Sequence, residues 1–166
     1  MGLVAVNHQP EPQEGSQQTG ETIMGTHAHI GIKNADGSIE AVFCHWDGYP
    51  EFVGRILRDS YTAEEKVRQL ITLGNMSVLG SRLAPIELTA EQVEELGVVD
   101  PATHSVMKPQ RDVCLFYHRD RGDDWSKCKP LRFPSEQVAL DNVESKYLYI
   151  FAPDGNGCGT WETKMR

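Results

Sequence analysis

The 166-residue chain has no run of apolar residues near the roughly 18 that a membrane-spanning helix needs. Its first residues lack the basic stretch and the long apolar stretch of a secretory signal. None of its four cysteines form a CxxC pair, so a zinc ribbon is not expected. The P-loop, dinucleotide-binding, HExxH and GxSxG motifs are missing too. We therefore expect a cytoplasmic protein with reduced thiols and no cofactor.

Basic residues are outnumbered in this chain. Sixteen lysines and arginines accompany 24 aspartates and glutamates, which gives a formal net charge of −8. Most of such a surface repels nucleic acid, so we do not expect nucleic-acid binding. The acidic residues are interspersed with lysine and arginine, whereas a DNA mimic needs acidic residues in dense rows. We interpret the charge as serving solubility.

The length of the chain fits one domain with a short extension. Residues 1–23 contain too few large apolar side chains to order themselves alone, so we expect a flexible N-terminal arm there. Residues 24–166 are then a single domain. Within it, glycine, proline and polar residues predict an exposed loop region near 81–111, and a capping box at Thr89 predicts a short helix inside that region.

Apolar alternation predicts the strands of this domain. The Asp36-Gly37 turn separates two runs, near 27–33 and 38–45, which we expect to form a β-hairpin. Further strands are expected at 113–117, 146–151 and 160–164. Seven residues are predicted to lie largely in the core: Ile30, Ile32, Val42, Val113, Leu115, Leu148 and Ile150.

Helical spacing predicts two successive helices near 51–59 and 63–73, the second opened by a capping box from Thr62 to Glu65. Ser135 is expected to cap a further helix. The order of elements lacks the regular alternation of a doubly wound fold. We therefore predict an α+β fold, in which an antiparallel sheet of about five strands carries two to four helices on one face.

Functional side chains concentrate in two segments, 44–51 and 117–124, each of which follows a predicted strand. If these strands are neighbours, the segments meet at one edge of the sheet. Arginine suits carboxylate or phosphate, and aromatic rings offer flat surfaces for a base or a sugar. The predicted binding residues are His45, Trp46, Asp47, Tyr49, Arg119 and Arg121. The alternative, which we favour slightly, is a structural clasp in which Asp47 caps the following helix or pairs with an arginine.

Histidines offer a second possible site. The His27-x-His29 pair places both rings on one face of a strand, and His45 of the hairpin partner can join them as a metal ligand. We favour instead a pair of polar residues on the solvated face of the strand, and we expect no metal. Cys44 beside His45 does not indicate a thiol nucleophile, because adjacent strand residues point to opposite faces.

The octapeptide CHWDGYPE at 44–51 is the most specific motif of the chain. Together with Asp36-Gly37, Tyr61-Thr62 and the Arg-Asp-Arg-Gly segment at 119–122, it resembles a family of small hypothetical proteins. These occur in tailed bacteriophages and in bacterial genomes that carry prophages. The resemblance runs from about 24 to 161 and omits much of 81–111. It implies a phage origin, and it implies no mechanism.

Three functions remain open from the sequence. The first, which we favour, is a phage accessory protein in the host cytoplasm that binds a host or defence component or sequesters a small charged ligand. The second is a small enzyme for a phosphorylated or nucleotide-like substrate, with His45 or Asp47 as general base and Arg119 and Arg121 as anion clamps. The third is a minor virion component held by its N-terminal arm.

Overall fold

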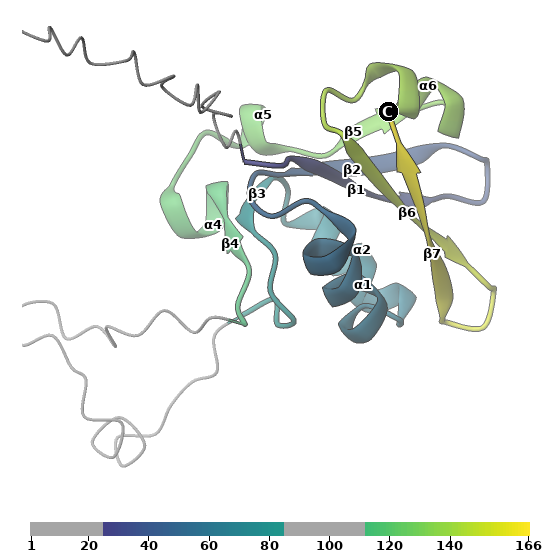
Figure 1. Cartoon of the computed structure of the whole chain (residues 1–166), viewed down its shortest axis with the longest axis horizontal. Coiled ribbons are helices and arrows are strands. Elements are labelled where there is room, and N and C mark those ends of the chain that lie inside the picture. The colour runs from purple at the N-terminus through teal and green to yellow at the C-terminus, as the bar shows by residue number, and fades with distance from the viewer. Residues whose placement is uncertain (1–24, 85–111) are drawn as a thin grey trace, which may run out of the picture.

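The computed structural model describes residues 25–84 and 112–166 (Figure 1). The predicted arm at 1–23 and the predicted helix from Thr89 lie outside these residues, as does most of the predicted loop region near 81–111. The described part has an α+β fold, as the sequence predicts.

A β-hairpin forms the centre of the sheet. Strand β1 (Ala28–Lys33) pairs antiparallel with strand β2 (Ile39–Cys44), and Ile30 lies opposite Val42. Gly37 in the connecting turn has a φ of 83°, a conformation that glycine adopts without a steric penalty. The Asp36-Gly37 turn signal therefore predicted this hairpin correctly.

The sheet contains seven strands in the described part, in the order β4-β3-β2-β1-β6-β7, with β5 beside the start of β2. The remaining strands are β3 (Met76–Val78), β4 (Leu115–Phe116), β5 (Leu131–Phe133), β6 (Tyr147–Pro153) and β7 (Gly159–Met165). The pairs β1–β6 and β2–β3 are parallel and the other pairs are antiparallel. The prediction of about five strands, all antiparallel, was therefore too simple, because β3 and β5 are too short to show a periodic pattern.

Helices cover both faces of this sheet (Figure 1). A π-helical turn η1 (Pro50–Gly54) leads into α1 (Arg55–Ser60), and α2 (Glu64–Thr72) follows; these three elements pack on one face. Helix α6 (Glu136–Asn142) packs on the other face, so the prediction that all helices share one face was wrong. Two short helices, α4 (Tyr117–Arg121) and α5 (Trp125–Cys128), follow β4.

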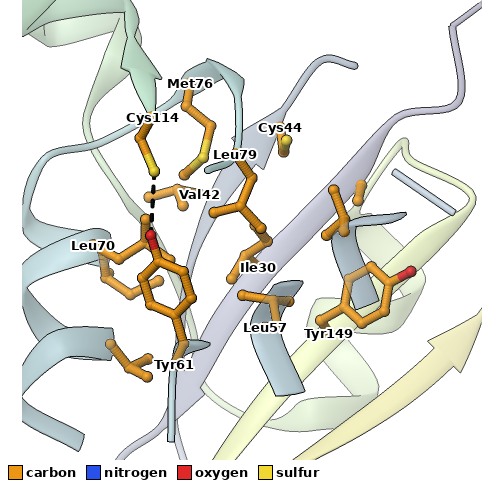
Figure 2. Packing of buried hydrophobic residues seen from close by; sticks show 14 of the residues in the cluster. Ile30, Val42, Cys44, Leu57, Tyr61, Leu70, Met76, Leu79, Cys114 and Tyr149 are labelled. Carbon is orange, nitrogen blue, oxygen red and sulfur yellow. Dashed lines mark hydrogen bonds between the residues drawn. The ribbon is translucent and has the colours of Figure 1, made fainter. Parts of the chain in front are cut away.

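The larger core lies between the sheet and the helices α1 and α2 (Figure 2). Ile30 and Val42 of the hairpin pack there, and the hydroxyl of buried Tyr61 lies 2.6 Å from the Gly80 carbonyl oxygen and 3.2 Å from Cys114 Sγ. A smaller core lies under α6, where Leu148 and Ile150 pack against the helix. Both cores are built by strand alternation, which sends neighbouring residues to opposite faces.

Three local predictions were wrong or incomplete. Leu115 is 40% exposed, and Val113 is only partly buried, because the alternating residues Cys114 and Phe116 point into the core instead. The Thr62 hydroxyl does not cap α2, whose N-cap is Ala63. The Glu64 amide instead donates to the Gly157 carbonyl in the β6–β7 turn. The Ser135 cap is confirmed, because its hydroxyl oxygen accepts a hydrogen bond from the Val138 amide.

The four cysteines are all free. Within the described residues, we find no helix with the length and apolar character that crossing a membrane requires.

Candidate functional site

The first predicted segment extends the sheet beyond the end of β2. The His45 and Trp46 amides donate to the Met76 and Ser77 carbonyl oxygens, at 3.1 and 3.0 Å, so the chain continues to pair with β3. At Asp47 the backbone turns with a φ of 55°, in the left-handed region that few residues other than glycine adopt. This turn directs the chain from the sheet toward η1.

The same segment is tied to the residues just before β1, and to β6, as well. The Gly48 amide donates to the Thr26 carbonyl at 2.7 Å, and the Tyr149 hydroxyl donates to the Gly48 carbonyl at 2.8 Å. A Cβ at position 48 would lie 2.6 Å from the carbonyl carbon of His27, so only glycine fits here. The backbone from 45 to 48 is therefore fixed by hydrogen bonds to three neighbouring segments.

The second predicted segment lies against the first. Its residues form helix α4 rather than a loop, and Gly122, with a φ of 74°, ends the helix. The Tyr117 hydroxyl lies 3.0 Å from Nδ1 of His45. The Arg121 guanidinium carbon lies 4.9 Å from the centroid of the Tyr117 ring, within cation–π distance.

His45 is the residue through which the two segments meet. Burial lowers the pKa of His45, and the nearby His27 and Arg121 lower it further. The imidazole is therefore biased toward its neutral form, which has one ring nitrogen that donates and one that accepts a hydrogen bond.

Further aromatic and histidine rings lie next to His45 along the sheet. The rings of His27, Phe43, His45 and Trp46 have neighbouring centroids 4.6 to 5.9 Å apart. We call these four residues, together with Tyr117 and Arg121, the ring cluster. Trp46 is its most exposed aromatic ring, at 46%, and a Cβ at Gly25 would lie 2.8 Å from that ring.

The predicted partnership of Asp47 with an arginine is not formed. In residues 25–84 and 112–166, Asp47 makes no ion pair with either Arg119 or Arg121. Asp47 is not a side-chain cap either, because the N-cap of η1 is Tyr49. The backbone carbonyl of Asp47 accepts a hydrogen bond from the Val53 amide of η1 at 3.3 Å.

Arg119 has a structural environment. Its Nε and Nη2 atoms both lie 2.9 Å from the Asp120 carboxylate oxygens, and Nη2 also donates to the Cys114 carbonyl at 3.1 Å. Its Nη1 atom donates to the Leu83 carbonyl. All three nitrogens are therefore engaged, and the guanidinium packs over the Phe116 ring. Arg119 holds β4, α4 and residue 83 together and is separate from the ring cluster.

The remaining predicted residue, Tyr49, is 37% exposed and lies beside Phe52, with ring centroids 6.2 Å apart. A cavity of about 910 Å³ runs along α2. Its lining includes Arg119 but none of the other five predicted residues. The ring cluster is thus part of the surface rather than of that cavity.

Hydrogen bonds hold the histidines of the second possible site. Nδ1 of His29 lies 2.7 Å from the Ser145 hydroxyl, and Nδ1 of His27 lies 2.7 Å from the His45 carbonyl. Burial lowers the pKa of His29 to about 4. The described residues contain no group of three or more metal-ligating side chains that could hold an ion. The expected solvated pair is also wrong for His29, which is buried because Ser145 and Phe43 cover it.

No family model, curated protein or solved structure matches the chain.

Three members of the ring cluster were not among the predicted binding residues: Phe43, Tyr117 and His27, which was considered only as a metal ligand. The hairpin register offered a signal for Phe43, since it lies opposite His29 on the same face. Tyr117 had no such signal, because the period-two pattern assigned it to a strand. Its role depends on the start of α4 at that residue, which turns its hydroxyl toward His45.

Proposed function

We propose that this protein is a phage-encoded accessory protein that binds a host or defence protein in the infected cell through the ring cluster. The observation that carries this proposal is the exposed Trp46 beside His45, Tyr117 and Arg121. Tryptophan, tyrosine and arginine are the residue types most enriched at binding hot spots. The phage-like octapeptide at 44–51 supplies two of the six residues of the ring cluster, His45 and Trp46.

The rigidity of the segment supports a binding role. Hydrogen bonds with β3, with Thr26 and with Tyr149 fix the backbone at 45–48. A surface fixed in advance loses little conformational freedom when a partner binds, so more of the contact energy appears as affinity. The neutral bias of His45 lowers the cost of burying it against a partner.

The contacts of Arg119 weigh against the enzyme alternative. An anion clamp of two arginines requires both guanidinium groups to be available to the substrate. Arg119 already donates to the Asp120 carboxylate and to two backbone carbonyls, which leaves Arg121. A small anion held by one arginine on an open surface gains little affinity. A protein partner, which covers Trp46 and Arg121 together, suits this surface better.

Affinity capture from phage-infected cells tests the proposal. The full chain, with a tag, is compared with its Trp46→Ala and Arg121→Gln variants. The matched controls are Val138→Ala, an exposed apolar residue of α6, and Arg132→Gln, an exposed arginine that pairs with Asp36. Thermal melting establishes that each variant is folded.

We expect one stoichiometric host protein with the parent chain and with both controls, and about a tenfold or greater loss with Trp46→Ala and with Arg121→Gln. Equal capture by all five proteins would reject the ring cluster as the binding surface. Capture of virion proteins alone would favour the structural alternative. A small anion retained in native mass spectrometry, lost in Arg121→Gln, would favour ligand sequestration.

A further inference from the structure

The outer edge of β7 presents free backbone groups in the described part of the chain. The Asp154 amide donates to the Cys158 carbonyl, and the Arg166 amide donates to the Lys146 carbonyl. Even-numbered residues of this strand therefore bond to β6 in the alternating antiparallel pattern. The N–H and C=O groups of Trp161, Thr163 and Met165 point the other way.

This edge lacks most of the features that prevent strand pairing. The register with β6 is continuous from Gly159 to Met165, without a bulge, and the strand contains no proline. Natural edge strands are usually short, bulged, covered or rich in charge. Among residues 25–84 and 112–166, no strand pairs with the outer edge, and the nearby Ala63–Cys158 bridge precedes β7.

The side chains of β7 divide by face. Glu162 and Lys164 lie on the α6 side, where Lys164 Nζ is 2.9 Å from Glu136 and 3.2 Å from Glu162. Trp161 and Met165 lie on the other side, and Met165 is 65% exposed. The strand thus has one charged face, on which a negative and a positive side chain lie two residues apart, and one apolar face.

We propose that a second copy of this chain pairs antiparallel with the outer edge of β7, about a two-fold axis at Thr163. In this register Thr163 lies opposite Thr163 of the other copy. Any other residue of β7 lies opposite the residue that is equally far from Thr163 on its other side. The outward N–H and C=O groups of Thr163, and those of Trp161 and Met165, then bond to the other copy. The two sheets become one continuous sheet.

The side chains select this register through charge complementarity. Glu162 faces the other copy's Lys164, and the two-fold axis repeats the pair. These are non-hydrogen-bonded positions, where side chains of facing strands lie closest, so opposite charges there stabilise the pairing. On the apolar face, Trp161 covers the exposed Met165 of the other copy. A shift of two residues would bring like charges together, because each Lys164 or each Glu162 would face itself.

Sedimentation velocity and native mass spectrometry of the full chain over a concentration series test the proposal. We expect a monomer–dimer equilibrium. Thr163→Pro removes an outward N–H and leaves the β6 ladder intact, so it should produce a folded monomer. Wild-type chain that stays monomeric at the highest concentration would overturn the proposal.

Charge exchange tests the register independently of any strain at proline. Glu162→Lys alone and Lys164→Glu alone each place like charges opposite one another, and each should weaken the dimer about tenfold. An equimolar mixture of these two variants should form heterodimers, because one chain then carries two lysines and the other two glutamates. Dimers that persist unchanged in both variants, or a mixture without preference for heterodimers, would assign the contact to another surface and reject the model.

Discussion

The Tyr117 hydroxyl and Nδ1 of His45 lie 3.0 Å apart, and their hydrogen bond joins two segments separated by 72 residues in the chain. Tyr117→Phe keeps the ring and removes the hydroxyl. We expect the free energy of unfolding to fall by about 1 kcal/mol, because one partly buried hydrogen bond is lost. Urea denaturation measures the change.

Tyr49→Phe is the matched control, since Tyr49 is exposed and its hydroxyl makes no hydrogen bond within the described residues. We expect that change to stay within about 0.5 kcal/mol. Equal losses in the two variants would mean that the His45–Tyr117 contact does not contribute to stability.

The left-handed conformation of Asp47 makes a second prediction. Asp47→Gly should leave stability unchanged or raise it by up to about 1 kcal/mol, because glycine adopts a φ of 55° without a Cβ clash. Asp47→Ala should lower it by about 1 kcal/mol. The control is Asp59→Ala in the exposed part of α1, where we expect a change within about 0.5 kcal/mol. If glycine and alanine at position 47 behave alike in thermal and urea melts, the backbone is not strained there.

The buried His29 predicts a loss of stability in mild acid. Its pKa is about 4 in the folded chain against 6.5 for a free histidine. Below pH 6.5 the unfolded chain binds a proton that the folded chain does not, so stability falls as the pH falls from about 6.5 to 4. A difference of about 2.5 pKa units corresponds to about 3 kcal/mol at the acidic limit.

His29→Gln removes this titration and keeps a polar group near Ser145. Unfolding in urea at pH 7, 6 and 5 should give a flatter pH dependence for the variant, even if its stability at pH 7 is lower. His118→Gln, at an exposed position of α4, should retain the slope of the parent chain. The same slope in His29→Gln and in the parent chain would show that His29 is not the group responsible.

Local signals predicted the centre of the fold well. The Asp36-Gly37 turn and the alternation around it gave β1 and β2, and the spacing of Val67, Leu70 and Ile71 gave α2. These elements are set by residues close together in sequence. The capping of α2 was mispredicted because the Glu64 amide donates its hydrogen bond to the carbonyl of Gly157, which is distant in sequence.

The candidate site shows the same limit. The sequence predicted that the segments 44–51 and 117–124 meet at one edge of the sheet if their strands are neighbours. The two segments do meet, through His45 and Tyr117. The helical geometry of α4 decides which of the two arginines lies near His45. No local sequence pattern predicts this choice. Arg119 and Arg121 look equivalent in sequence, yet Asp120 and the Leu83 carbonyl engage only the first.

The same substitution at these two arginines separates scaffold from binding surface. Arg119→Gln removes a charged group that contacts the Asp120 carboxylate and the Cys114 carbonyl, so we expect the free energy of unfolding to fall by about 1–2 kcal/mol. Arg121→Gln should change it by less than about 0.5 kcal/mol, since Arg121 makes no ion pair within the described residues.

The effects of the two substitutions on partner binding should be the opposite of their effects on stability. Partner capture below the melting temperature should survive Arg119→Gln and fall about tenfold in Arg121→Gln. Unfolding by Arg121→Gln would make the ring cluster a structural clasp, and loss of capture in a folded Arg119→Gln chain would move the binding surface toward the cavity along α2.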